Sequence, residues 1–460
     1  MLGDWRVGEG SLARRLAHAL EKAVHDGRLP LDAQLPAERL LAGELGLARG
    51  TVAASYQILR AERLIVTRTG SGSTVSMPPR LHDRLAPWAS DQGEAGRNGA
   101  PLDLTVAEPA APFDELLRAV REATDMLPAE LLGASGGGRP SALHTGVADL
   151  YNAQEFMTDD GHLLLTSGAD AALSLLSAAY LRPNSRVVLD SPTYPGALAL
   201  FRSTGARLVS QPLDPTGWDV PALDRTLTTA RPSLTYLIAD FHNPTGLLMD
   251  EEDRTELRRR LHSHDTLVVF DETMRDLDLR EAAAPPPRLA ARAGDRHIVY
   301  VGSLSKSLWP GLRVGWIRAH RDVVRRLAAL PLATALAPSP FDRLVATRLL
   351  EARRAILERR RVQLAHHRDH LVARLSALPW CRFQVPQGGL SLWLELPDTD
   401  SRRLAVLAAR HNLALTPGFY FSPDGTLDHY LRLPFTLPPE ALDTAVDRLT
   451  EAHASLKGSH

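Results

Sequence analysis

Lysine is scarce in this chain of 460 residues, and one lysine lies inside an ordered motif. The 53 basic residues include only three lysines, at positions 22, 306 and 457. Lys306 follows an apolar run, residues 298–301, in the sequence VYVGSLSKSLWPGLRVGW. A lysine in apolar surroundings has a lowered pKa and becomes a nucleophile, whereas an arginine guanidinium stays protonated. We therefore expect Lys306 to bond a carbonyl group rather than to lie at a surface turn.

The residues near Lys306 in the sequence could hold a phosphate. Ser303 and Ser305 precede the lysine and Arg313 follows it. Hydroxyl groups and the two-pronged guanidinium are suitable partners for phosphate oxygens. Residues 166–170 (TSGAD) follow an expected strand and open a helix, whose first backbone N–H groups can also bind phosphate. A nucleophilic lysine beside a phosphate site points to pyridoxal 5'-phosphate (PLP), whose aldehyde a lysine can bond.

Three further side chains follow apolar runs that read as strands. Asp271 ends the run at residues 266–270, and a carboxylate there could keep a pyridine nitrogen protonated. Tyr194, in the loop SPTYPG, offers a flat ring for stacking, and Asn243, in HNPTG, offers an amide to a ring hydroxyl. Taken alone, Asp271 could cap a helix, Tyr194 could be an ordinary packed tyrosine, and HNPTG could be an ordinary turn.

The elements that position these residues form an α/β body. From about residue 101 onward, short apolar runs alternate with helical stretches, which is typical of an α/β fold. Residues 79–100 mix Pro, Gly, charged and small polar residues without periodicity, so we expect a linker there. Residues 1–78 precede it as a compact head. The organisation we predict is a head (1–78), a linker (79–100) and a body (101–460).

The head reads as three helices and a hairpin. Leucines and a valine recur every four residues from Leu12 to Val24, and that helix ends near Gly27. Pro36 begins a second helix over residues 37–45, which Gly46 ends, and a third covers about residues 48–62. Residues 64–67 and 74–75 alternate around the Gly70–Gly72 turn as a hairpin. This order predicts a winged helix-turn-helix.

A winged helix-turn-helix implies particular contacts with double-stranded DNA. The second helix of the pair, with Arg49 and Thr51 near its start, would enter the major groove. Phosphates or the minor groove would be reached by Arg39, Arg68, Gly70, Ser71 and Gly72. A head that merely packs or dimerises is the alternative. Residues 1–80 hold 11 basic and 8 acidic residues, a small basic excess compatible with a nucleic-acid partner.

Composition excludes several other classes of protein. The single cysteine, Cys381, permits neither an intramolecular disulfide nor a cysteine-based metal site. No window holds 18 consecutive apolar residues, so we expect no membrane span, and the first residues do not read as a signal peptide. We expect a cytoplasmic protein with no metal site.

Two family resemblances follow from these motifs. Over about 65 residues the head, with LPAERL, LGLARGTV and GSG, resembles the GntR-type winged-helix domain, although Ala48 replaces a common Ser or Thr. In order, TSGA, SPTYPG, HNPTG, FDE, SLSKSLWPGLRVGW and YLRLPF resemble fold-type I PLP enzymes of the class I aminotransferase group. That resemblance implies a mostly parallel sheet with helices on both faces and a smaller α+β subdomain at about residues 340–460.

The resemblance also implies a role for each matching residue. Lys306 would form the Schiff base (an aldimine) with PLP, Asp271 would pair with the pyridine nitrogen, and Asn243 would bind the ring hydroxyl. Tyr194 would stack on the ring, and Arg432 would bind the carboxylate of an amino-acid ligand. The phosphate would be held by Gly168, Ala169, Asp170, Ser303, Ser305 and Arg313. The family usually has a tyrosine where this chain has Met274, so we expect a perturbed Schiff-base pKa and less efficient chemistry.

The combined architecture resembles the MocR subfamily of bacterial transcription regulators. This resemblance implies a homodimer, with each head docked on the partner's body, that senses PLP or an amino compound through the Schiff base at Lys306. A working aminotransferase acting on an amino acid is the principal alternative, and residual transaminase activity would fit either function. A third possibility is a scaffold whose PLP site is a relic.

Overall fold

The computed structural model describes most of the head and body. The residues it describes are 5–6, 10–25, 29, 33–61, 64–68, 72–75, 101–133, 141–154, 157–281, 286, 288 and 296–457. The expected linker at residues 79–100 and the predicted contacts at Gly70 and Ser71 lie outside these residues. The boundaries expected for the domains remain predictions.

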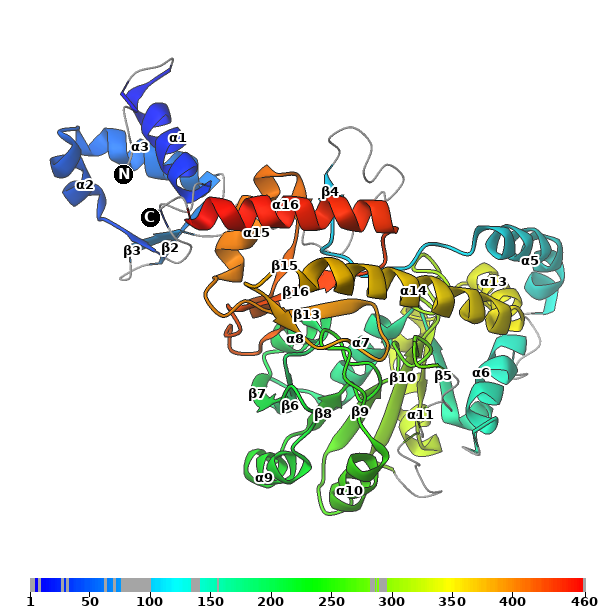
Figure 1. Ribbon diagram of the computed structural model, residues 1–460. Helices are drawn as coiled ribbons and strands as arrows, with labels where there is room; N and C mark the ends of the chain where they lie inside the picture. Colours follow the sequence, from blue (N-terminus) through cyan, green and yellow to red (C-terminus); the bar gives the residue numbers. More distant parts are fainter. Residues whose placement is uncertain are drawn as a thin grey trace.

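The head contains three helices and a small antiparallel sheet (Figure 1). The helices are α1 (Leu12–His25), α2 (Glu38–Leu45) and α3 (Arg49–Ala61). The sheet has the order β1 (Gln34–Leu35), β3 (Gly72–Val75), β2 (Ile65–Arg68). Leu16, Val52 and Tyr56 pack in the core of the head, and the Tyr56 hydroxyl donates to the Pro36 carbonyl at 2.8 Å. Gly46 adopts φ +61° and ends α2, as the sequence predicts.

A seven-stranded sheet forms the centre of the body. Its order is β5 (Leu163–Thr166), β11 (Gly315–Arg318), β10 (Ile298–Ser303), β9 (Leu267–Asp271), β8 (Leu234–Leu237), β6 (Arg186–Ser191), β7 (Arg207–Pro212). Only β11 runs antiparallel to its neighbours. The central strands β8, β9 and β10 are buried along their whole length because helices cover both faces of the sheet.

Alternate residues of each strand belong to two different cores. Val268 and Phe270 of β9 pack in one apolar cluster, whereas Leu267 and Val269 pack in the other. Side chains alternate across a strand, so the two clusters lie on opposite faces of the sheet. The first face packs against α5 (Phe113–Gly133), α6 (Ala142–Asn152), α9 (Val220–Ala230), α10 (Glu251–Leu261) and α13 (Pro340–Glu351). The second packs against α7 (Ala169–Tyr180), α8 (Pro195–Ser203), α11 (Arg321–Ala328) and α12 (Pro331–Ala335).

A second lobe contains a four-stranded antiparallel sheet with the order β12 (Arg382–Phe383), β13 (Ser391–Glu395), β16 (Tyr430–Pro434), β15 (Thr416–Pro417). Its helices are α14 (Arg353–Ser376), α15 (Ser401–Arg410) and α16 (Pro439–Lys457), which lie together in Figure 1. Short 3₁₀ turns cover Asp160–His162 and Gly418–Phe421. β4 (Leu102–Asp103) pairs in parallel with β14 (Leu413–Ala414), so the first described residues of the body belong to this lobe.

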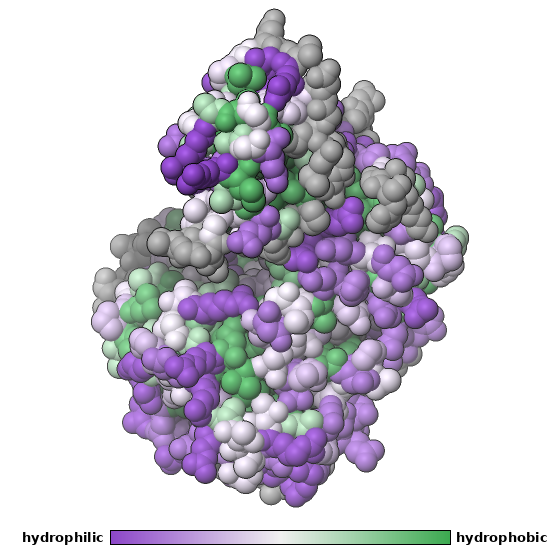
Figure 2. All heavy atoms as spheres, turned by 90° about the vertical axis from the view of Figure 1, so that its left-hand side faces the viewer, coloured by the Kyte–Doolittle hydropathy of each residue, from purple (hydrophilic) through white to green (hydrophobic). Residues whose placement is uncertain are grey.

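Hydrophilic side chains are spread over the face of the molecule seen in Figure 2. Among the described residues, no helix combines the length and apolar character that a membrane span requires. The apolar side chains are instead concentrated in the three clusters of the body and the separate cluster of the head.

Gly315 on β11 leaves no room for a side chain beside the turn that opens α7. A Cβ atom at this position would lie 2.7 Å from the Gly168 carbonyl carbon and 2.8 Å from the Gly302 oxygen. We expect Gly315→Ala to lower the free energy of unfolding by about 1–3 kcal/mol, the usual cost of forcing atoms into a packed site. Chemical denaturation followed by tryptophan fluorescence measures this loss.

Gly43→Ala is the matched control, because a Cβ atom at Gly43 meets nothing within 4 Å. The body transition of this variant should coincide with that of the parent. An unchanged denaturation midpoint for Gly315→Ala would contradict the packing argument.

Candidate functional site

Two neighbouring strand ends bring the predicted residues together. β9 ends at Asp271 and β10 ends at Ser303, and the two strands pair in parallel with Val301 opposite Asp271. Tyr236 on β8 lies opposite Val269, on the same face of the sheet as Asp271. The turn after β10 carries Lys306. The site therefore lies at the carboxyl edge of the central sheet, where ligands bind in open α/β folds.

Lys306 meets the first segment of the body. Its Nζ donates to the Ala107 carbonyl at 3.2 Å and to Glu108 Oε1 at 3.2 Å. Burial lowers the pKa of Lys306, and the nearby Glu108 carboxylate opposes that shift. The lysine is thus a partly desolvated amine with one counterion, which is the environment that a nucleophilic lysine needs.

Asp271 is held by two hydrogen bonds. Its Oδ1 accepts from the Thr273 backbone N–H at 2.9 Å, and its Oδ2 accepts from the Tyr236 hydroxyl at 2.6 Å. Burial raises the pKa of Asp271, and these hydrogen bonds counter the rise. The carboxylate is therefore oriented at a strand end, with lone pairs left for a further donor such as a pyridine nitrogen.

Three of the predicted phosphate residues, Gly168, Ala169 and Asp170, form the turn that opens α7. Gly168 precedes α7 with φ +102°, and the Thr166 hydroxyl donates to its carbonyl at 2.9 Å. The amides of Ala169 and Asp170 belong to the first turn of α7, where N–H groups lack partners within the helix. A Cβ atom at Gly168 would meet nothing within 4 Å, so space is open above this turn. The turn can thus receive an anion.

The two serines form a linked pair beside this turn. The Ser303 hydroxyl lies 3.0 Å from that of Ser305 and 3.1 Å from the Val314 carbonyl, and the Ser305 hydroxyl lies 3.2 Å from the Leu312 carbonyl. Arg313 lies between the two residues that supply these carbonyls and is exposed. The pairing of the hydroxyls orients the serines, and their binding of phosphate stays a prediction.

Tyr194 is tied to the same turn. Its hydroxyl donates to Asp170 Oδ1 at 3.3 Å, and burial raises the pKa of this phenol. Its ring lies against Gly196, where a Cβ atom would come within 2.5 Å of the ring. Asn243 is half-buried in the loop after β8. The roles proposed for both side chains toward a cofactor ring remain predictions.

Arg432 is a buried cation on β16. One of its terminal nitrogens donates to the Thr105 carbonyl, and its guanidinium lies 5.1 Å from the Phe421 ring centre. Its Nε meets no hydrogen-bond partner among the described residues. Burial lowers the pKa of Arg432 to about 10. A buried guanidinium with an unused donor fits a ligand carboxylate, which would form two parallel hydrogen bonds with it.

These observations agree with a PLP site. Lys306 supplies the amine, Asp271 an oriented carboxylate, the Gly168 turn an open anion site and Arg432 an unused donor for a carboxylate ligand. The donor set has the chemistry that the cofactor requires.

Sequence reasoning missed three contributors to this site. Tyr236 holds Asp271 from 35 residues away, and Glu108 reaches Lys306 from 198 residues away. Thr105 supplies the carbonyl for Arg432. Met274, which replaces the usual tyrosine, is buried with Phe241 in the second-lobe cluster. The sequence signal for Tyr236 is a hydroxyl-bearing side chain within an apolar run that reads as a buried strand.

The head presents part of its predicted DNA surface. Arg39 on α2 and Arg49 at the start of α3 are exposed, and Arg49 Nε lies 3.7 Å from Glu38 Oε2. Thr51 is half-buried on α3, and Gly72 begins β3. Arg68 ends β2, but its side chain lies outside the described part of the chain.

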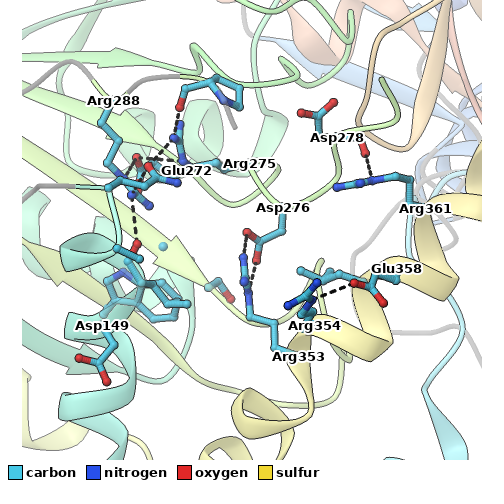
Figure 3. Close-up of a pocket in the computed structure, with 18 residues that line it drawn as sticks. Asp149, Glu272, Arg275, Asp276, Asp278, Arg288, Arg353, Arg354, Glu358 and Arg361 are labelled. Atoms are coloured by element: carbon cyan, nitrogen blue, oxygen red, sulfur yellow. Dashed lines mark hydrogen bonds and ion pairs between the residues drawn. The ribbon is translucent and has the colours of Figure 1, made fainter. Parts of the chain in front are cut away.

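A charged cavity of about 450 Å³ lies beside the strand ends, and Lys306 is not part of its lining (Figure 3). Glu272, Ser303 and Arg288 contribute to its wall. Its arginines pair with neighbouring acceptors: Arg288 with Glu272 at 2.8 Å, Arg354 with Glu358 at 3.0 Å and Arg353 with Asp276. Ion pairs therefore stabilise the wall of this cavity, which includes Glu272 and Ser303 next to the strand ends of the site.

Asp190 and His242 form a second buried pair next to the Asn243 loop. Asp190 Oδ2 lies 3.8 Å from His242 Nε2, and neither atom has a hydrogen-bond partner within the described structure. Burial raises the pKa of Asp190 to about 7, and burial lowers the pKa of His242 to about 3. Below neutral pH the pair therefore carries its proton on Asp190, while the histidine stays neutral.

This pair predicts a loss of stability as the pH rises toward and through neutral. The folded protein binds more protons at Asp190 than the unfolded chain does, so the stability that this group contributes is lost as the pH rises through about 7. From pH 6 to pH 8 we expect a loss of about 1–2 kcal/mol from Asp190. Asp190→Asn should remove this component, because an amide does not titrate. Urea denaturation of both proteins at pH 6, 7 and 8 measures the difference, and parallel pH profiles would contradict the assignment.

A prediction for Asp271 follows from its two hydrogen bonds. Asp271→Asn keeps the shape of the side chain but removes the negative charge that a protonated pyridine nitrogen requires. We expect PLP affinity to fall by about 10–100-fold, since a hydrogen bond to a charged group contributes roughly 1.5–3 kcal/mol. Absorption titration with PLP measures the change, with Asp369→Asn, an exposed carboxylate on α14, as the control outside the site. Equal affinities for Asp271→Asn and the parent would rule out the proposed contact.

The comparisons with known proteins agree with this geometry. Residues 103–449 match the aminotransferase class I and II family, and residues 12–75 match the family described as bacterial regulatory proteins, gntR family. The structure resembles that of LysN, an alpha-aminoadipate aminotransferase from Thermus thermophilus complexed with N-(5'-phosphopyridoxyl)-L-leucine. The TM-score is 0.70 at 30% identity, over 82% of this chain and 97% of that chain.

Relatives in sequence include enzymes and regulators. The chain is 35% identical over 306 residues to 2-aminoadipate transaminase of Thermus thermophilus, covering 64% of this chain and 75% of that protein. It is 28% identical over 497 residues to HTH-type transcriptional regulator TauR of Rhodobacter capsulatus, covering 97% of both. It is also 27% identical over 407 residues to a Rhizobium meliloti protein named "Probable rhizopine catabolism regulatory protein MocR", covering 81% of this chain and 80% of that protein.

The match across the body covers well over half of the chain. PLP is the cofactor of this fold-type I aminotransferase domain. The chain therefore belongs to the aminotransferase class I and II family and, with its gntR-family head, has the architecture of the MocR-type transcription regulators.

Proposed function

We propose that this protein regulates transcription by binding operator DNA through its head and sensing PLP, an amino compound or both through a Schiff base at Lys306. The observation that carries the proposal is the presence of both sites in one chain. A winged head with exposed Arg39 and Arg49 precedes a body in which Lys306, Asp271 and Arg432 belong to the candidate ligand site. Full-length similarity to a regulator, TauR, supports it.

The DNA contacts proposed for the head divide by type. Arg49 and Thr51, at the start of α3, would contact base edges in the major groove. Arg39, Arg68, Gly70, Ser71 and Gly72 would contact phosphates or the minor groove. A homodimer with each head docked on the partner's body would present two heads to two half-sites, and this linkage multiplies the affinity of each head.

The body would bind the sensed molecule. When bound, PLP supplies an aldehyde for the amine and a ring that withdraws electrons from it. Lys306 would hold the cofactor, and Asp271 and Asn243 would orient the ring under Tyr194. The Gly168 turn, Ala169, Asp170, Ser303, Ser305 and Arg313 would hold the phosphate. Arg432 would bind the carboxylate of an amino-acid effector through its unused Nε donor.

A ligand changes DNA binding only if it favours one arrangement of the protein over another. Arg432 belongs to the second lobe, whereas Lys306 follows the central sheet. A ligand that replaces Lys306 on the cofactor and pairs with Arg432 would therefore bind both lobes at once. We propose that the two lobes take two relative positions, and that the arrangement of the heads depends on which position the lobes take.

A PLP-dependent aminotransferase is the second candidate function. It is favoured by 35% identity to a protein named 2-aminoadipate transaminase. The head argues against it, because transamination needs no winged helix. Sustained turnover with an amino donor and a keto acid, together with failure to bind operator DNA, would favour the enzyme.

The regulator proposal predicts DNA binding that responds to the cofactor. Fluorescence anisotropy of labelled DNA from upstream of the gene for this protein, at fixed salt concentration, measures the affinity with and without PLP. We expect specific binding that PLP shifts. Lys306→Ala should retain binding but lose the shift, whereas Arg49→Ala should lose about 1–3 kcal/mol of specific binding, the usual contribution of a base contact.

Lys457→Ala is the matched control, since this lysine ends α16 far along the chain from the site. It should respond to PLP as the parent does. A Lys306→Ala variant with an intact response would refute sensing through Lys306, and binding no tighter than to unrelated DNA would refute the regulator at this operator.

A further inference from the structure

One short segment crosses the ligand site and meets its cations. We call residues 102–110 the strap. Its Thr105 carbonyl accepts from Arg432, and its Ala107 carbonyl and Glu108 carboxylate accept from Lys306. The Ala110 carbonyl accepts from Arg360. Glu108 is the only residue of the strap whose anionic side chain forms an ion pair with one of these cations.

Lys306 needs a counterion whenever a ligand replaces it on PLP. In that exchange the carbon–nitrogen double bond to Lys306 breaks and a double bond to the ligand nitrogen forms. The ligand arrives as an ammonium ion, so its spare proton and the two protons removed from its nitrogen end on the lysine, which leaves as an ammonium ion. The released cation then lies in a partly desolvated place, where an unpaired charge is unfavourable.

The observed geometry already provides for this released lysine. Glu108 Oε1 lies 3.2 Å from Lys306 Nζ, with side-chain exposures of 32% and 26%, and the Ala107 carbonyl gives the ammonium a second acceptor at 3.2 Å. Arg432 and Asp170 also act on the charge of Lys306, in opposite directions. The charge nearest the released amine is therefore that of Glu108.

We propose that Glu108 is a positioning residue that holds the released Lys306 as an ammonium ion, so that a bound amine stays on the cofactor instead of being transaminated. This inference rests on the function proposed above. Transamination requires a base that takes a proton from the ligand carbon, and the released lysine is the amine placed to do so. An ammonium ion has no lone pair, so a lysine paired with Glu108 cannot act as that base. The ion pair thus favours a long-lived ligand complex, which suits a sensor.

The test uses the full-length, PLP-loaded protein and its Glu108→Gln variant. The standard L-amino acids and short diamines are added in turn, and absorption spectra report both formation of the ligand complex and its later conversion to the amine form of the cofactor. Appearance of keto acid is measured separately. We expect the parent complex to persist. Glu108→Gln should convert about tenfold faster, the effect of one pKa unit on the fraction of free lysine, and should bind the amine more weakly.

Two further variants separate positioning from a general structural effect. Glu108→Asp keeps the charge and should restore much of the persistence of the complex. Glu115→Gln removes a carboxylate on α5 that pairs with Arg359 on α14, and it should behave as the parent. Equal conversion by the parent and Glu108→Gln would overturn the proposal, as would conversion faster in the parent or no complex with any amine.

The outcome is independent of DNA binding. A head that fails to bind operator DNA would refute the proposed function while leaving the spectral difference between the parent and Glu108→Gln measurable. Conversely, a regulator that responds normally to PLP but whose complexes convert equally with and without Glu108 would refute this inference alone.

Discussion

Placing charged groups in apolar surroundings at the edge of the central sheet is the constraint on which the rest of this site depends. Three of these groups, Asp271, Lys306 and Arg432, lose water on folding. Burial shifts the pKa of each in the direction that favours its neutral form: it raises the pKa of the aspartate and lowers those of the lysine and the arginine. The fold compensates unequally: Asp271 accepts two hydrogen bonds, Lys306 has one counterion, and Arg432 has a carbonyl but an unused Nε. The least compensated group is Arg432, and a ligand carboxylate would accept a hydrogen bond from its unused Nε. The buried charge thus gives this site a physical reason to bind a carboxylate.

Much of the site could be predicted because it follows strand ends. The apolar runs before Asp271 and Ser303 identify buried strands, and parallel neighbours place the residues that follow them at one edge. The head was equally readable, since Gly46 and the period of its leucines mark helix ends and a buried face. Local pattern is sufficient wherever the contacts are made within an element or between adjacent strands.

Contacts between distant segments could not be predicted in this way. No periodicity indicates that Glu108 meets Lys306, because their approach depends on how the start of the body pairs with β14 in the second lobe. Tyr236 likewise reads as an ordinary apolar residue of a buried strand until its hydroxyl is seen to reach Asp271. Met274 shows the converse: the sequence reveals the missing tyrosine, but its burial beside Phe241 emerges only from packing. One strap thus joins two lobes that the sequence describes separately.

The scarcity of lysine has a consequence for selectivity toward aldehydes. Free PLP condenses with accessible amines in general, and a lysine-rich surface would collect adducts that have no bearing on the signal. With three lysines among 53 basic residues, this chain offers such stray reactions few targets, while arginine maintains its surface charge. Borohydride trapping of the bound cofactor should therefore label this protein almost at a single position, so occupancy could be read from intact mass. The scarcity of lysine therefore keeps low the number of PLP adducts that form away from Lys306.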